Sequence, residues 1–237
     1  MNRMDGKICV ITGATQGLGR QLPAGWPMRG TRHCHYRAQR GTGAALAHTL
    51  TADSGMPTVF IRADLESVED CRAVIDETHR HFGRVDVLVN AGALTERGTI
   101  LDTDPELFDR IFATNVRGPY FLMQEAIRNM IRDGIEGPSA ISGPFPRCRA
   151  SLSSAPTALP RGALATLTAN TAFSVMANRI RVNQLNIGWM ASDKEREIQL
   201  AETNDPDWME KAASRLPFGR LVTPEEAARA VNFPCIR

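Results

Sequence analysis

The chain has 237 residues, of which 43% are hydrophobic, and its formal net charge is +2 at pH 7. This size fits one α/β domain spanning residues 1–237, and the small charge without a run of Lys or Arg argues against nucleic acid or an anionic membrane as the main partner. Residues 1–20 hold only a short apolar run, too short for a signal peptide or a membrane span. Five scattered cysteines suit a reducing compartment, so we expect a cytoplasmic protein.

Apolar runs alternate with helical patterns, which is the signature of βαβ units and a mostly parallel sheet. Strands are predicted at residues 7–11, 58–61, 85–89 and 180–185. Helices are predicted at residues 67–82, 107–131 and 162–177, where apolar or small residues recur at helical spacing. Near the end, Thr223 is the predicted N-cap of another helix, with Pro224 at its first position and Glu225 and Glu226 in its first turn. His33-Cys34-His35 has no second ligand pair nearby, and neighbours in a strand point to opposite faces, so we expect no metal site.

A glycine-rich segment follows the first predicted strand: Thr12-Gly13-Ala14-Thr15-Gln16-Gly17-Leu18-Gly19. Gly13 would permit a tight turn, Gly17 would let the backbone approach a pyrophosphate, and Gly19 would allow close packing of helix on strand. The phosphate would then lie on amides at a helix N-terminus. Such a segment is often only a turn, but its place between a buried strand and a helix start indicates a dinucleotide site.

The spacing T-G-x-x-x-G-x-G resembles the short-chain dehydrogenase/reductase family, and four further matches follow in the family's order. Asp64-Leu65 resembles its adenine-contacting acid, and Asn90-Ala91-Gly92 resembles its N-A-G motif beside the cofactor. Asn115 matches the asparagine that organises a proton-relay water, and Arg181-Val182-Asn183 matches the stretch before the nicotinamide loop. Taken singly, each has another reading: Asp64 as a cap, Asn90 as a turn residue and Asn115 at a helix kink.

This resemblance implies an α/β fold, a Rossmann-type doubly wound parallel sheet with helices on both faces. It also implies an NAD(P)-dependent oxidoreductase that transfers hydride between nicotinamide and a small alcohol or carbonyl substrate. Family members are commonly dimers or tetramers through the two long helices, so a homodimer or homotetramer is expected. The resemblance assigns cofactor binding to Thr12, Gly13, Gln16, Gly17, Leu18, Gly19, Asp64, Leu65, Asn90, Ala91 and Gly92, and a catalytic role to Asn115.

The family's reaction needs a Tyr-x-x-x-Lys motif, with tyrosine as the general acid/base, and a serine upstream. Counted back from the small-residue helix, Arg161 stands in the lysine slot, Thr157 in the tyrosine slot and Pro144 in the serine slot. Threonine lacks phenol-like acidity, proline has no hydroxyl, and arginine is no useful proton donor at neutral pH. We therefore expect the chemistry to be impaired.

Two further places depart from the family pattern. Within residues 22–40, Pro23 and Pro27 interrupt the first helix, and the second strand, expected to be apolar inside the sheet, is polar and basic. Residues 233–237 stop before the family's last strand. We therefore expect a disrupted second strand and a truncated last one.

A shift of reading frame would unite these departures. With one choice of codons, residues 33–40 together with the neighbouring bases, read in another frame, give G-I-V-I-T-G-R-N-A-E-R-G, an apolar strand and the family's usual turn. Residues 156–161 give Y-C-A-S-K, residues 140–144 give N-I-x-S, and the ending gives F-L-A-S. The hypothesis is that two compensated frameshifts and one terminal frameshift, in the gene or in its sequencing, separate this chain from an active ancestor. The arginine of the alternative frame would favour NADP(H) over NAD(H), and Arg37 is the nearest basic residue as written.

Two other functions stay open: a catalytically inactive relative that binds a nucleotide or a partner subunit through the long helices, and a product that folds poorly. Cofactor binding separates the first from the second. The substrate is set by loops after the later strands, here residues 189–216. Within them, Trp189, Met190, Trp208 and Met209 either line an apolar pocket or pack between helices.

Overall fold

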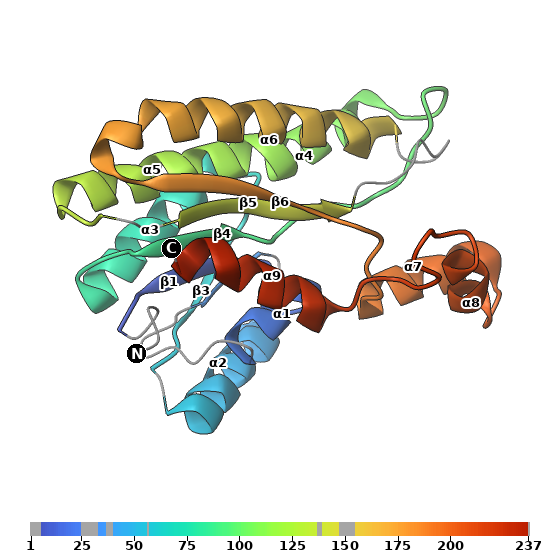
Figure 1. Ribbon diagram of the computed structural model, residues 1–237, viewed down its shortest axis with the longest axis horizontal. Coiled ribbons are helices and arrows are strands. Elements are labelled where there is room, and N and C mark those ends of the chain that lie inside the picture. Colours follow the sequence, from blue (N-terminus) through green and yellow to red (C-terminus); the bar gives the residue numbers. More distant parts are fainter. Residues whose placement is uncertain are drawn as a thin grey trace.

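The structure is a computed structural model that describes residues 6–24, 33–36, 40–55, 57–136, 139–146 and 155–236. The strands within these ranges run parallel in two sheets, a four-stranded one of order β1-β4-β5-β6 and a two-stranded one of β2 and β3 (Figure 1). Their bounds are β1 Cys9–Thr12, β2 His33–Tyr36, β3 Phe60–Ala63, β4 Val87–Asn90, β5 Ser139–Pro146 and β6 Arg181–Ile187. The four predicted strands are present, each shifted by one or two residues toward the C-terminus.

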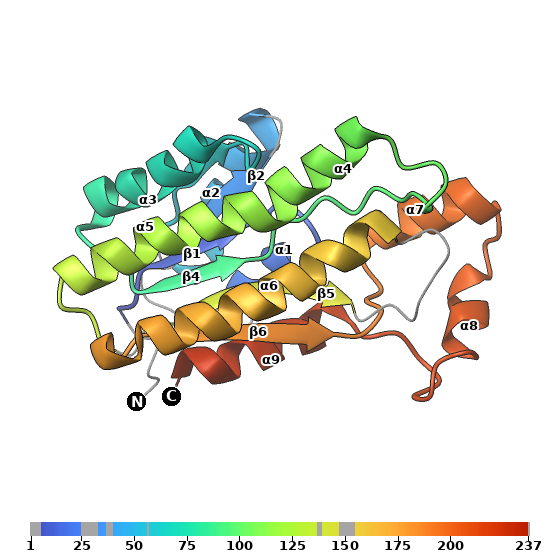
Figure 2. The ribbon, with the colours of Figure 1, turned by 90° about the horizontal axis from the view of Figure 1, so that it is seen from above.

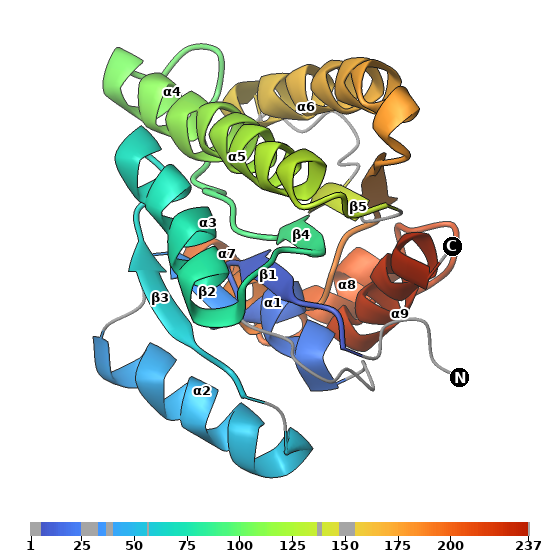
Figure 3. The same cartoon turned by 90° about the vertical axis from the view of Figure 1, so that its left-hand side faces the viewer.

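Helices cover both faces of the larger sheet, as the end-on view in Figure 3 shows. The helices on one side are α3 Val68–Phe82, α4 Pro105–Phe112, α5 Gly118–Arg132 and α6 Ala155–Ser174, and those on the other are α1 Gly17–Ala24 and α9 Pro224–Ile236. The remaining helices are α2 Arg40–Ser54, α7 Asp193–Thr203 and α8 Trp208–Ala213. The predicted doubly wound α/β fold is confirmed.

The strands are apolar on both faces because both faces are covered. Val10 and Leu88 pack into the cluster beneath α3 and α5, whereas their neighbours Ile11 and Val89 pack into the cluster with α1 and α9. Alternate residues of β1 and β4 therefore belong to different cores, as the two-residue period of a strand requires. The sheet is fixed between these two layers, and its carboxyl edge carries the loops that build the site.

The predicted helix over residues 107–131 is interrupted, which the periodicity did not reveal. Its two α-helical parts, α4 and α5, are joined by a π-helical turn at Ala113–Arg117, where the Gly118 N–H bonds to the Ala113 carbonyl. The helix predicted at residues 162–177 begins earlier, at Ala155, and ends at Ser174. Pro160 lies inside α6, where it removes one backbone hydrogen bond of the helix.

The second strand forms in spite of its polar sequence. Its backbone pairs with β3 in parallel register, from His33 opposite Phe60 to Tyr36 opposite Ala63. A ladder uses backbone groups that every residue but proline carries, so a polar sequence can still pair. β2 also lies beside β1, but no hydrogen-bonded ladder joins the two within the described residues, so β2 and β3 form a separate two-stranded sheet. The side chains of β2, including His33-Cys34-His35, lie outside the described structure.

Both ends of the chain differ from the simple pattern. Pro23 lies in the last turn of α1, which ends at Ala24, and Pro27 lies outside the described residues. At the other end the described chain finishes in α9, without a strand after it. The predicted start of α9 is confirmed, since Thr223 Oγ1 accepts a hydrogen bond from the Glu226 N–H and the Glu226 carboxylate accepts one from the Thr223 N–H. None of the helices in the described ranges has the length and apolar content to span a membrane.

Candidate cofactor site and catalytic positions

The glycine-rich turn and the Asn90-Ala91-Gly92 segment interlock at the carboxyl edge of the sheet. Gly13 has φ +69°, and a Cβ on it would lie 2.5 Å from the Cα of Gly92. The Gly92 N–H donates to the hydroxyl of Thr12 over 3.0 Å. The two segments therefore touch backbone to backbone, and only glycine fits at this point of contact.

The same turn leads directly into α1, and its glycines leave room for the close approach of the helix to the turn. Gly17, the first residue of α1, has φ +53°, and a Cβ on Gly19 would lie 2.5 Å from the carbonyl oxygen of Gly13. Leu18 is buried in the core with α9, whereas Gln16 is exposed. The first amides of α1 have no partner within the helix, so the segment presents N–H groups of the kind that bind phosphate.

Two of the remaining predicted cofactor residues also have structural roles. Asp64 follows β3, and its Oδ1 accepts a hydrogen bond from the Glu66 N–H over 2.9 Å, which makes it a turn-capping residue. Leu65 is buried in the core, and a Cβ on Gly118 would lie 2.5 Å from its carbonyl oxygen. Glycine at this position therefore lets α5 approach the segment after β3 closely.

Asn90 ends β4 with its side chain 2% exposed, and neither polar atom of its amide has a hydrogen-bond partner among the described residues. A buried polar group without a partner costs about 1–3 kcal/mol. Such an amide beside the Thr12–Gly92 contact fits a site where a polar ligand completes the bonding.

Asn115 lies in the middle of the π-helical turn and is fully buried. Its side-chain oxygen accepts from the Leu94 N–H and its side-chain nitrogen donates to the Leu94 carbonyl, both over 2.8 Å. Asn115 therefore holds the loop after β4 against the helix, and the kink and the asparagine occur together. π-Turns of this kind are frequent at functional sites.

The three catalytic positions lie on β5 and on the start of α6. Pro144 is in β5, although its side chain lies outside the described structure, and Thr157 and Arg161 are one turn apart in α6. Thr157 is 7% exposed, and the Nε of Arg161 is buried without a hydrogen-bond partner in the described part of the chain. The structure therefore places a hydroxyl and a guanidinium one helical turn apart, at the positions where the sequence predicts the tyrosine and lysine slots.

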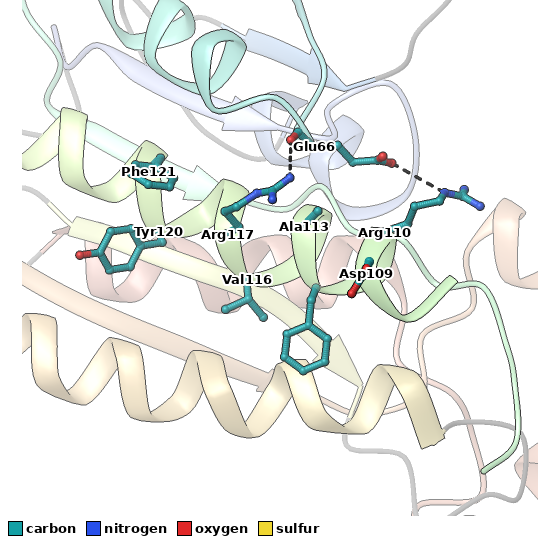
Figure 4. Close-up of a pocket in the computed structure, with 9 residues that line it drawn as sticks. Glu66, Asp109, Arg110, Ala113, Val116, Arg117, Tyr120 and Phe121 are labelled. Atoms are coloured by element: carbon teal, nitrogen blue, oxygen red, sulfur yellow. Dashed lines mark hydrogen bonds and ion pairs between the residues drawn. The ribbon is translucent and has the colours of Figure 1, made fainter. Parts of the chain in front are cut away.

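The described cavities lie elsewhere. A cavity of about 710 Å³ lies along α4, the π-helical turn and the start of α5 (Figure 4). Its lining residues are Glu66, Asp109, Arg110, Phe112, Ala113, Val116, Arg117, Tyr120 and Phe121. A smaller one of about 240 Å³ lies between the loop before α4 and the start of α6. Neither of these two cavities is lined by the glycine-rich turn.

The tryptophans after β6 pack in an apolar cluster around α8, which favours the packing alternative that the sequence left open. Trp208 is buried with Ala212 and Leu221, and Trp189 packs against this cluster with its ring centroid 6.2 Å from that of Trp208. Met190 packs against the core of α1 and α9, whereas Met209 is 42% exposed.

Comparison with known proteins agrees with this architecture. Residues 13–235 match the family model described as Enoyl-(Acyl carrier protein) reductase. An uncharacterized oxidoreductase of Thermotoga maritima is 30% identical over 96% of this chain and 89% of its own length. Versicolorin reductase 1 of Aspergillus parasiticus is 29% identical over 98% of this chain and 90% of its own length.

Solved structures match over the whole chain. L-Sorbose reductase of Gluconobacter frateurii, in complex with NADPH and L-sorbose, superposes with a TM-score of 0.91 at 23% identity, over 100% of this chain and 92% of its own. A short chain dehydrogenase of Burkholderia cenocepacia in complex with NADP gives a TM-score of 0.85 at 20% identity, over 100% and 93%. With the family model covering most of the sequence and the fold shared throughout, the chain belongs to the short-chain dehydrogenase/reductase family.

Proposed function

We propose that this chain binds NADP(H) in the cytoplasm and is an oxidoreductase whose hydride transfer with an alcohol or carbonyl substrate is impaired as written. The observation that carries the proposal is the contact of Gly13 with Gly92 at the start of α1, a cradle that any side chain would fill. The unpartnered amide of Asn90 beside it supports the same site. The preference for NADP(H) over NAD(H) rests on the arginine of the alternative frame and on the cofactors of the two solved relatives.

Each part of the chain would have a separate task in this function. The amides from Gly13 to Gly19 would bind the pyrophosphate, with Thr12 and Gly92 holding the turn in place. Asp64 and Leu65 would border the adenine, and Asn90 and Ala91 the nicotinamide side of the cleft. Asn115, fixed by both bonds to Leu94, would orient the proton-relay water. A bound nicotinamide would supply or accept the hydride.

The proton that must accompany the hydride would have no carrier at the family's catalytic positions. Thr157 and Arg161 would occupy the positions of the general acid/base and its lysine, so a hydroxyl without phenol-like acidity and a guanidinium stand in place of a phenol and an amine. General acid–base catalysis typically contributes about 10²–10⁴-fold in rate. Turnover should therefore fall by at least this factor, even with cofactor bound.

The second candidate function is a catalytically inactive relative that binds nucleotide or another copy of the chain. Helices α5 and α6 lie side by side on one face (Figure 2), and Tyr120, Phe173 and Met176 are exposed on or just after them. Such apolar side chains favour a homodimer or homotetramer through this face. This candidate binds the cofactor without turnover, so a turnover assay separates it from the impaired oxidoreductase.

The frameshift hypothesis explains how a nucleotide site could persist beside empty catalytic positions. Its test is peptide mass spectrometry of the protein from its native source, covering residues 137–161. Masses of the alternative-frame peptide, with Y-C-A-S-K, would mean that the native protein is an active dehydrogenase. Masses of the peptide as written would refute a sequencing error and leave a catalytically inactive member of the family.

Cofactor binding is tested by adding one methyl group to the turn. Gly17→Ala puts a Cβ where it meets only Ser192 and Met190, at 3.8 and 3.9 Å, so the fold accommodates it. The methyl would stand where the pyrophosphate approaches, and NADPH affinity should fall by at least about tenfold.

The matched control is Gly134→Ala, at φ +61° with nothing within 4 Å of its Cβ. Both variants carry the same left-handed strain, about 1–2 kcal/mol, but only the first lies in the turn. Fluorescence titration with NADPH measures the cofactor affinity of both variants. Equal affinities would refute the turn as the site, and absence of binding to the unsubstituted chain would refute the function.

A further inference from the structure

One carboxylate joins three separate parts of the chain beyond the carboxyl edge of the sheet. Glu195, in the first turn of α7, accepts hydrogen bonds at a single oxygen, Oε1, from Arg97 over 3.0 Å, from Trp189 over 3.0 Å and from Gln199 over 2.9 Å. Its own N–H donates to the N-cap hydroxyl of Ser192. Glu195 is therefore the point at which α7 is attached to its surroundings.

Arg97 connects α7 to a distant loop. It lies between β4 and α4, and its guanidinium also pairs with Glu202. Glu195 and Glu202 are two helical turns apart and so lie on the same face of α7. The fork of the guanidinium thus bridges both carboxylates, with the Arg97 and Glu195 side chains only 29% and 20% exposed.

The connection crosses the place where the reaction would occur. In the order β4-β5-β6, Arg97 follows β4, and Trp189 and α7 follow β6, so the contact spans the carboxyl end of β5. Figure 2 shows α7 beyond the carboxyl ends of these strands. Pro144, which stands in the predicted serine slot, is in β5.

The same contact fixes the segment that faces the glycine-rich turn. Between Trp189 and α7, the chain lies beside Gly17, where an added Cβ would make ordinary van der Waals contact with Ser192 and Met190, at 3.8 and 3.9 Å. On its other side this segment pairs with Val222 through two backbone hydrogen bonds of 2.8 Å. The position of residues 190–192 over the turn therefore depends on Val222 from one side and on Glu195 from the other.

We propose that Glu195 is a positioning residue that, through Arg97, holds residues 190–192 and α7 closed over the bound cofactor. This inference rests on the proposed NADP(H) binding and adds how the cofactor is retained. Release then requires the Arg97–Glu195 pair to open. Charged donors bond more strongly to a carboxylate than to an amide oxygen, so loss of the charge at Glu195 weakens the closed state.

The test compares Glu195→Gln with Glu197→Gln. Glu197 is on the same helix, is 67% exposed and pairs only with Lys194 one turn away among the described residues, so the control removes the same charge without the long-range contact. Glu195→Gln should raise the NADPH dissociation rate, measured by stopped-flow displacement, by about tenfold, the worth of one charge-assisted hydrogen bond. Glu197→Gln should match the unsubstituted chain, and Glu195→Asp should recover part of the loss.

A second measurement needs no cofactor. Amide hydrogen exchange in residues 190–203 of the free protein should accelerate in Glu195→Gln and not in Glu197→Gln, because only the first releases α7. Unchanged exchange would overturn the attachment of α7. Faster exchange with an unchanged NADPH dissociation rate would overturn the positioning role. If the unsubstituted chain fails to bind NADPH, the proposed function and this inference both fall.

Discussion

A buried carboxylate clamps the first two strands of the larger sheet, and its removal should destabilise the fold more than a surface change. Asp86 immediately precedes β4, and its side chain is fully buried. It accepts hydrogen bonds from the Ile8 N–H over 2.9 Å, from Lys7 over 3.1 Å and from Arg84 through both Nε and Nη2. Asp86→Asn keeps the shape of the side chain but turns an N–H toward these donors.

The loss of stability in Asp86→Asn depends on the ion pairs that are broken and on how far the two cations remain in contact with water. Breaking a buried ion pair by removing one partner costs about 3–5 kcal/mol. Lys7 and Arg84 are 33% and 45% exposed, so both cations keep contact with water and the loss should lie near the lower end, at about 3 kcal/mol. For a domain of this size, each kcal/mol shifts Tm by about 2–4 °C, so Tm should fall by about 6–12 °C.

Urea unfolding followed by circular dichroism gives the free energy of unfolding, and calorimetry gives Tm. Asp76→Asn, an exposed change on α3, is the control and should stay within about 0.5 kcal/mol of the unsubstituted chain. If Asp86→Asn also stayed within that range, the carboxylate would not stabilise the strands, and the reasoning from burial and charged partners would be wrong.

Two further predictions concern catalysis and pH. The combined variant Pro144→Ser, Thr157→Tyr, Arg161→Lys should regain a proton carrier. With a panel of sugars and ketones it should oxidise NADPH at least about 10²-fold faster than the unsubstituted chain. A variant that binds NADPH but shows no gain in rate would contradict the assigned positions. The hydrogen bond from Arg132 lowers the pKa of Asp133, so its stabilisation is present above the ordinary aspartate pKa of 3.8 and is lost as pH falls through the lowered value. Asp133→Asn should therefore be less stable at neutral pH and equal below that range in urea titrations; a difference that persists in acid would contradict the linkage.

Local features of the sequence determined much of the fold. Several elements are encoded within a few residues each. Apolar runs predicted β1 and β4, Thr-Pro-Glu-Glu predicted the start of α9, and the glycine-rich segment predicted the turn at Gly13. Counting back from the small-residue helix gave the three predicted catalytic positions; in the structure Pro144 lies in β5, and Thr157 and Arg161 lie inside α6, which begins before the predicted start at residue 162.

Other features depend on groups far apart in the chain. Gly118 and Pro119 stand in the sequence at the break between α4 and α5, but Asn115 bonds to Leu94 only once the loop after β4 has folded against the helix. The polar second strand pairs because backbone groups, which the side-chain pattern does not report, make the ladder. In both cases the side-chain pattern of the segment did not predict the observed structure, because contacts with distant segments form it.

The sequence by itself determined the family plan, because each of the family's motifs stands within one short segment. The nucleotide-binding turn and the loss of the proton carrier are predictions from the same segments. Only the tertiary structure decided that Gly13 touches Gly92, that Asp86 joins the starts of β1 and β4, and that Glu195 receives Arg97 from another loop. Asp86 and Ile8 are 78 residues apart in the sequence, and Glu195 and Arg97 are 98 residues apart. Such pairs are set by how the strands are ordered in the sheet, and no local pattern records that order.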